Sequence, residues 1–153
     1  MVNKLNERSN LTKIIDTSLE ELNLKHYRYL DDLEGFIFKL EMPNNKMLDV
    51  IIIGEEKLGS VRMVVPEVWV IKSKMREIKK YVYNFNNMKI LYGTLSIYNS
   101  KKKRLVSYST AIPMTKSKTK NILKEELREL LNYVGYINHV LSKDLKEIEE
   151  NEG

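Results

Sequence analysis

A group of basic and aromatic side chains lies in the middle of the chain. The basic members are consecutive: Lys101, Lys102, Lys103 and Arg104. Three tyrosines flank them in the sequence: Tyr92, Tyr98 and Tyr108. Proteins hold single-stranded nucleic acid with cations along a groove and with aromatic rings on which the bases stack. The pattern therefore makes this stretch a candidate for binding nucleic acid or a protein partner. The alternative is that the tyrosines only form cross-strand pairs on the outer face of a sheet.

Further basic residues follow this group, at Lys116, Lys118, Lys120 and Lys124. Between residues 78 and 124 the chain has eleven lysines and arginines and no aspartate or glutamate. Such asymmetry creates a potential that attracts polyanions or an acidic partner surface. The alternative is that these lysines are solvated residues that keep the protein soluble and protect exposed strand edges.

The other residues that could carry chemistry form no complete site. The chain has no cysteine, which excludes disulfides, thiolate metal sites and a cysteine nucleophile. His26 and His139 have no further ligands at metal-binding spacing. The acidic stretch 31–34 fits an ordinary turn, and the loop from Gly54 to Gly59 lacks the Gly-Lys-Ser/Thr ending of a phosphate loop. We therefore expect no enzyme activity, no metal and no cofactor.

Length and composition indicate one domain. The chain has 153 residues, 42% of them hydrophobic and 31% charged, and a formal net charge of +5. We expect a disordered N-terminus over 1–9, a single domain over 10–145 and an acidic, frayed tail over 146–153. The start of the sequence shows no signal-peptide core, and the apolar run Val50–Ile53 is too short to span a membrane. These features favour a cytoplasmic protein without membrane contact.

The spacing of apolar residues predicts the elements that carry these side chains. Spacings of three and four predict helices over 11–24, 73–85 and 119–145, whereas alternation predicts strands. The expected strands are 36–42, 47–53, 60–65, 90–98 and 105–112, of which the last two form a hairpin around the basic run. Two additions stay open: a short leading strand over 26–29, and a continuation of the third strand past Pro66 over 68–71.

The resulting order is α-βββ-α-ββ-α. Strands joined by short turns pair in antiparallel fashion, and amphipathic helices must cover one face of the sheet they form. The sequence thus predicts an α+β fold with an antiparallel five-stranded sheet covered by helices.

Three segments carry a resemblance to a known family. These are the helix-forming stretch Ser73–Asn87, the strand Leu91–Ile97 and the segment Tyr108–Pro113 that leads to the last helix. Together with the order of elements, they are similar to the YbjN-type domain of bacteria, a proposed sensory transduction regulator. The order also resembles the type III secretion chaperone fold. The resemblance implies dimerisation and a protein partner bound on an exposed apolar surface, and it implies no catalytic residues.

We therefore expect a non-enzymatic protein-interaction module, regulatory or chaperone-like, that acts through an apolar surface on an unidentified protein partner. We expect it to be a homodimer that self-associates through the apolar excess of the last helix or through an open sheet edge. The alternative is a nucleic-acid-binding protein that uses the basic turn 101–104 and the stretch Lys116–Lys124, with affinity that falls steeply as salt rises.

Overall fold

The computed structural model describes residues 10–115, 118 and 120–151. The segment 1–9, for which we predicted disorder, lies outside the described residues, as does Lys116. The elements are α2 (Asn10–Glu21), β1 (Lys25–Leu30), η1 (Asp31–Leu33), β2 (Gly35–Glu41), η2 (Pro43–Asn45), β3 (Met47–Glu55), β4 (Ser60–Ile71), α3 (Met75–Met88), β5 (Thr94–Ser100), β6 (Lys103–Pro113) and α4 (Lys120–Glu150).

The strands form one antiparallel sheet in the order β1-β2-β3-β4-β6-β5. The predicted α+β class is confirmed, but the predicted count of five strands is wrong, because the short leading strand is formed and becomes β1. This strand pairs with β2 through Arg28–Ile37 and Tyr29–Phe36, after an irregularity between Lys25 and Arg28. The charged residues of β1 weaken the alternation that identifies strands. Pairing with β2, more than its own sequence, therefore makes this segment a strand.

Strand β4 continues past the proline at which we expected it to end. Its pairing with β6 shifts register between Val65 and Trp69, on either side of Pro66, and then resumes up to Ile71. A bulge leaves one residue without a ladder partner, so the missing N–H of a proline costs little there. The two halves of β4 therefore belong to one twelve-residue strand, and Trp69 lies in its second half.

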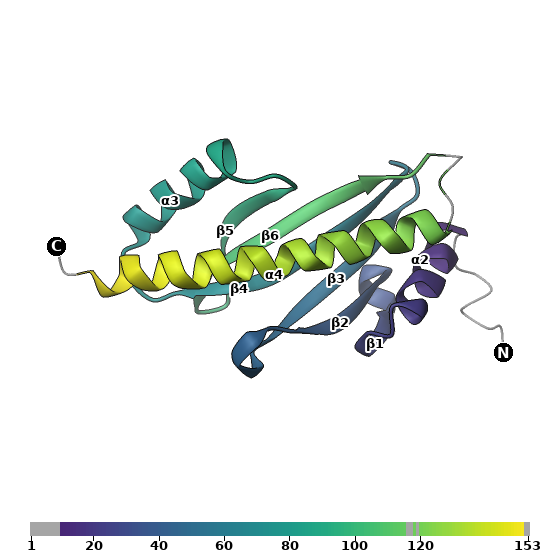
Figure 1. The fold of residues 1–153 in the computed structure, drawn as a ribbon, viewed down its shortest axis with the longest axis horizontal. Helices are drawn as coiled ribbons and strands as arrows, with labels where there is room; N and C mark the ends of the chain where they lie inside the picture. Colours follow the sequence, from purple (N-terminus) through teal and green to yellow (C-terminus); the bar gives the residue numbers. More distant parts are fainter. Residues whose placement is uncertain (1–9, 116–117, 119, 152–153) are drawn as a thin grey trace.

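All three described helices lie on one face of the sheet. Figure 1 shows α4 running along the length of the sheet, with α2 beside its beginning and α3 beside its C-terminal half. Buried side chains of the three α-helices and of strands β2 to β6 form one hydrophobic core between the helices and this face, and partly buried Tyr27 and Tyr29 of β1 pack against it. The α4 contribution is a stripe of residues at helical spacing: Leu123, Leu127, Leu131, Val134, Ile137, Leu141 and Leu145. None of the helices in the described ranges has the length and apolarity needed to cross a membrane.

Helix α4 extends beyond residue 145, where we expected it to end, and reaches Glu150. Ile148 packs against the core. The Glu149 carboxylate accepts hydrogen bonds from the Trp69 Nε1–H, at 2.5 Å, and from the backbone N–H groups of Lys72 and Ser73, at 2.9 and 2.8 Å. These contacts hold the last turns of α4 against β4 and the start of α3, so the acidic composition of this segment does not prevent it from being helical.

Candidate protein-binding surface

The predicted basic turn is exposed and lies at one end of the sheet. Residues 101 and 102 connect β5 to β6, and the four side chains of 101–104 are all solvent-exposed. Lys101 has a left-handed backbone, with φ of 54°, as the tight turn requires. The ion pair of Lys103 with Glu67 is long, at 3.7 Å, and exposed. The turn therefore keeps most of its positive charge.

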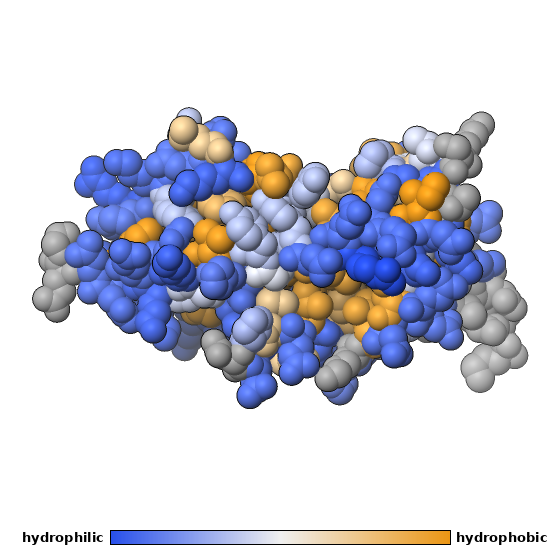
Figure 2. Space-filling view, in the orientation of Figure 1, coloured by the Kyte–Doolittle hydropathy of each residue, from blue (hydrophilic) through white to orange (hydrophobic). Residues whose placement is uncertain are grey.

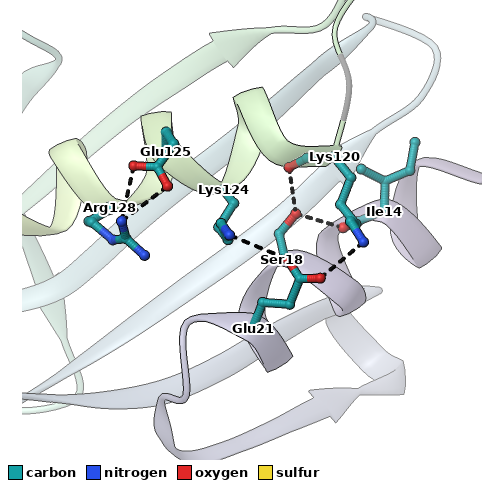
Figure 3. Close-up of polar contacts among 7 residues, drawn as sticks. All are labelled: Ile14, Ser18, Glu21, Lys120, Lys124, Glu125 and Arg128. Carbon is teal, nitrogen blue, oxygen red and sulfur yellow. Dashed lines mark hydrogen bonds and ion pairs between the residues drawn. The ribbon is translucent and has the colours of Figure 1, made fainter.

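The lysines that follow β6 have acidic partners. Lys118 donates to the Glu126 carboxylate, at 2.8 Å, and to a backbone carbonyl. Lys120 and Lys124 both point to Glu21 of α2, at 2.9 and 3.6 Å, as Figure 3 shows. The hydrogen bond from Lys120 is the largest cause of the lowered pKa of Glu21. These pairs join α2 to α4 and reduce the charge that a polyanion would meet.

The two basic groups lie far apart. The basic turn precedes β6 and the lysine stretch follows it, so the whole length of the strand separates them. At the rise of an extended strand, eleven residues span on the order of 30 Å. The structure thus does not unite the basic turn, Lys118 and Lys120 into one surface.

The three predicted tyrosines occupy three different environments. Tyr108 is fully buried in the core, so its assignment to a binding surface is corrected: its position on β6 faces the helices. Tyr98 is on the other face of the sheet and donates from its hydroxyl to the Pro66 carbonyl at 2.9 Å. Tyr92 precedes β5 and contacts α4. The three rings therefore do not share one face of the sheet, and they form no common surface with the basic turn.

Tyr92 instead belongs to a cluster that includes two tyrosines of α4. Its ring centroid lies 5.3 Å from that of Tyr133, which in turn lies 5.6 Å from that of Tyr136. We call Leu91, Tyr92, Tyr133 and Tyr136 the tyrosine patch. Tyr133 is buried at its centre, whereas Leu91, Tyr92 and Tyr136 are 75%, 56% and 51% exposed. Figure 2 shows apolar surface above α4, where the connection between α3 and β5 lies.

The segment that carries the patch is held at successive residues. The Leu91 N–H donates to the Tyr133 hydroxyl at 2.9 Å, and the Tyr108 hydroxyl donates to the Tyr92 carbonyl at 2.6 Å. Gly93 follows with φ of 83°. This is why β5 begins at Thr94 and not at residue 90 as predicted: Leu91 and Tyr92 bond to tyrosine side chains and Ile90 bonds to the backbone of α3, in place of the β6 backbone. The exposed side chains are thus presented on a fixed backbone, which lowers the entropy lost when a partner binds.

The segment that carries Leu91 and Tyr92 lacks acidic residues. The chain from residue 78 to residue 124 has no acidic residue, and Lys89 is exposed two positions before Leu91. On α4, the residues three and four positions from Tyr136 are Asn132, Tyr133, His139 and Val140. Since residues at these spacings are the neighbours of Tyr136 on the helix surface, none of them adds a carboxylate. Lys89 is thus the charged residue closest in sequence to Leu91 and Tyr92, whereas Glu129 lies four residues before Tyr133 on α4.

Strand β5 forms an edge of the sheet that α3 protects in part. The Asn86 side chain pairs with the backbone of Leu95 at both groups, accepting from its N–H at 2.8 Å and donating to its carbonyl at 2.9 Å. Outward-facing backbone groups recur at every second residue of a strand, so those of Ile97 and Asn99 also point away from β6. Within the described chain, no strand pairs with this edge.

The sequence contains a signal for part of the tyrosine patch, which the basic residues do not reveal. Tyr133 and Tyr136 interrupt a leucine-rich helix at a spacing of three, which places them on one side of α4. Their proximity to Tyr92 has no local signal, since about forty residues of intervening chain set it. The two histidines are exposed on β1 and α4, and among the described residues no three His, Asp or Glu side chains gather as metal ligands would.

Comparisons with known proteins identify a similar fold. A crystal structure of YbjN from E. coli, a proposed transcription regulator, superimposes with a TM-score of 0.66 over 87% of this chain and 92% of that chain, at 10% sequence identity. The predicted likeness to the YbjN-type domain is therefore confirmed for the fold. No protein-family model matches the sequence, and no curated protein matches it.

Proposed function

We propose that the protein is a non-enzymatic regulatory module that binds an acidic, apolar segment of a partner protein through the tyrosine patch. The carrying observation is that Leu91, Tyr92 and Tyr136 are exposed together on a backbone fixed by hydrogen bonds. Tyrosine is enriched among the residues that dominate binding energy in interfaces, and grouped apolar exposure marks interaction sites. The exposed Lys89 and the lack of acidic residues between positions 78 and 124 favour an acidic partner through charge complementarity. The YbjN-like fold is consistent with a regulatory role but assigns no partner.

This function predicts binding of an acidic amphipathic peptide. The probe is a fluorescently labelled peptide of leucine and glutamate, with the same peptide carrying lysine for glutamate as its counterpart, and the readout is fluorescence anisotropy. We expect the acidic peptide to bind and its lysine counterpart not to bind. Tyr92→Ser and Tyr136→Ser should each weaken this binding about tenfold or more, because interface tyrosines contribute large shares of affinity.

Tyr83→Ser is the matched control, since Tyr83 is a still more exposed tyrosine on α3 outside the patch. It should leave the affinity unchanged. Equal binding of the two peptides, or an equal loss in Tyr83→Ser, contradicts the proposal. Salt-sensitive binding of labelled single-stranded DNA that is lost on replacing Lys101–Arg104 would favour the nucleic-acid alternative in its place.

The module is also proposed to be a homodimer, joined through the open part of the β5 edge. The observation in its favour is that Asn86 covers this edge only at Leu95, which leaves Ile97 and Asn99 without a strand partner in the described chain. Antiparallel pairing of β5 with the same strand of a second copy satisfies these groups by a two-fold axis. The apolar stripe of α4, the other surface we considered, is already buried against the sheet of its own chain.

Asn99→Pro tests the dimer. The substitution removes an outward N–H that β6 does not use, so the fold should persist while pairing between copies is lost. Light scattering should report a dimer for the unchanged protein and for Asn99→Ala, which keeps the N–H, but a monomer for Asn99→Pro. A monomer at high micromolar concentration of the unchanged protein would remove this proposal.

A further inference from the structure

A cleft of about 510 Å³ lies away from the tyrosine patch. Its walls come from the beginning of β3, the second half of β4 and the last turns of α4, which are segments far apart in the sequence. The apolar residues that line it and are not fully buried are Met47, Trp69 and Val70. The volume falls within the range of pockets that hold small molecules, which are mostly apolar with a few polar groups that fix orientation.

The cleft contains an ammonium group, that of Lys46, whose positive charge has no ion-pair partner among the described residues. Lys46 Nζ donates to the Val68 carbonyl at 3.1 Å and to Asn138 Oδ1 at 3.0 Å, and both acceptors are neutral. An ammonium has three N–H groups, so this one can donate once more. Burial lowers the pKa of Lys46, a change that nearby Glu67 opposes. The cost of partial desolvation is therefore offset by two neutral oxygens and by Glu67, with which Lys46 forms no ion pair.

Two of the three glutamates that line the cleft, Glu149 and Glu67, have other partners. Glu149 receives the Trp69 indole N–H and two backbone N–H groups, and Glu67 pairs with Lys103 across 3.7 Å. Among the described residues, no carboxylate oxygen lies within ion-pair distance of Lys46 Nζ. A carboxylate supplied by a ligand would therefore form the ion pair that this ammonium lacks among the described residues.

We propose that this cleft binds a small amphipathic carboxylate, with its anionic group on Lys46 and its apolar body along Trp69. The carboxylate accepts the remaining N–H in a charge-assisted hydrogen bond, which is shorter and stronger than the bonds to neutral oxygens. The apolar body covers the indole ring and the aliphatic side chains beside it, and it gains by leaving water. A neutral ligand of the same length lacks the first of these contributions.

Trp69 makes the test direct, because it is the single tryptophan of the chain and lines the cleft. The probe is sodium decanoate, with 1-decanol as its neutral counterpart, and the readout is tryptophan fluorescence. We expect a saturable change with decanoate and an affinity about tenfold or more weaker for decanol, as expected for loss of a hydrogen bond between charged groups.

Lys46→Met should reduce the affinity for decanoate to that for decanol. Lys57→Met, which makes the same charge change in the exposed turn after β3, should leave it unchanged. Two results with the unchanged protein would overturn the proposal: equal affinities for decanoate and decanol, or no saturable change with decanoate. Neither result depends on whether a variant folds. Unchanged affinity in a folded Lys46→Met variant would overturn the proposal as well.

Discussion

Gly93→Ala is expected to destabilise the protein severely. Gly93 has φ of 83°, a left-handed conformation that alanine adopts only under strain. An added Cβ would overlap the Ser109 carbonyl oxygen and would lie 2.9 Å from Thr110 Cβ and 3.0 Å from Tyr108 Cε1. Because β5 pairs with β6 immediately afterwards, the backbone cannot move away from these atoms without loss of the ladder. Backbone strain and overpacking together should cost about 3 kcal/mol or more.

The measurement is the free energy of unfolding in urea, and the chain offers a matched control. Gly135 lies within α4, and nothing stands within 4 Å of a Cβ added to it. Gly135→Ala should therefore stabilise the protein by about 0.5–1 kcal/mol through helix propensity. The same chemical change thus has opposite signs at the two sites. Similar effects at both positions would mean that the turn before β5 is not built as described.

Glu149→Ala is expected to release the last turns of α4. The carboxylate accepts the Trp69 indole N–H and the backbone N–H groups of Lys72 and Ser73, which stand just before α3. Hydrogen bonds to a charged group contribute about 1.5–3 kcal/mol each when shielded, and part of this site is solvated, so we expect a total loss of about 2–3 kcal/mol. The negative charge also favours the positive N-terminal end of α3.

Urea unfolding gives the size of this loss, and amide hydrogen exchange over residues 144–150 shows where it acts. Glu149→Gln should lose less stability than Glu149→Ala, since the amide keeps one acceptor oxygen. Glu147→Ala is the control, because it removes the same charge from an exposed position two residues earlier in α4. If Glu147→Ala and Glu149→Ala have equal effects, the carboxylate of Glu149 does not hold the helix end.

Local patterns were sufficient to predict most elements. The stripe of Leu123, Leu127 and Val134 repeats at the period of a helix, and alternation with a polar turn between residues 98 and 105 predicts a hairpin. The predictions failed where a partner decides the structure. Examples are β1, which needs β2 beside it, and β4, which passes Pro66 because β6 resumes pairing beyond the bulge.

The candidate site was less accessible to sequence reasoning. Between residues 78 and 124 the charged residues are all basic, but β6 separates the basic turn from the lysines that follow this strand. Tyr108 looks like its neighbours in composition, yet its position on β6 faces the helices and is buried. Tyr133 and Tyr136 lie within the predicted last helix, and only the packing of α4 on the sheet brings them to Tyr92.

The amino-acid sequence by itself determined the three α-helices of the described residues, the hairpin with its basic turn and the α+β class, because periodicity and turn chemistry act between residues close along the chain. The tertiary structure alone decided the order of the strands, the separation of the basic groups, the tyrosine patch and the cleft beside Trp69. Each of these depends on segments many residues apart, whose contacts are set when helices and sheet bury their apolar faces against one another.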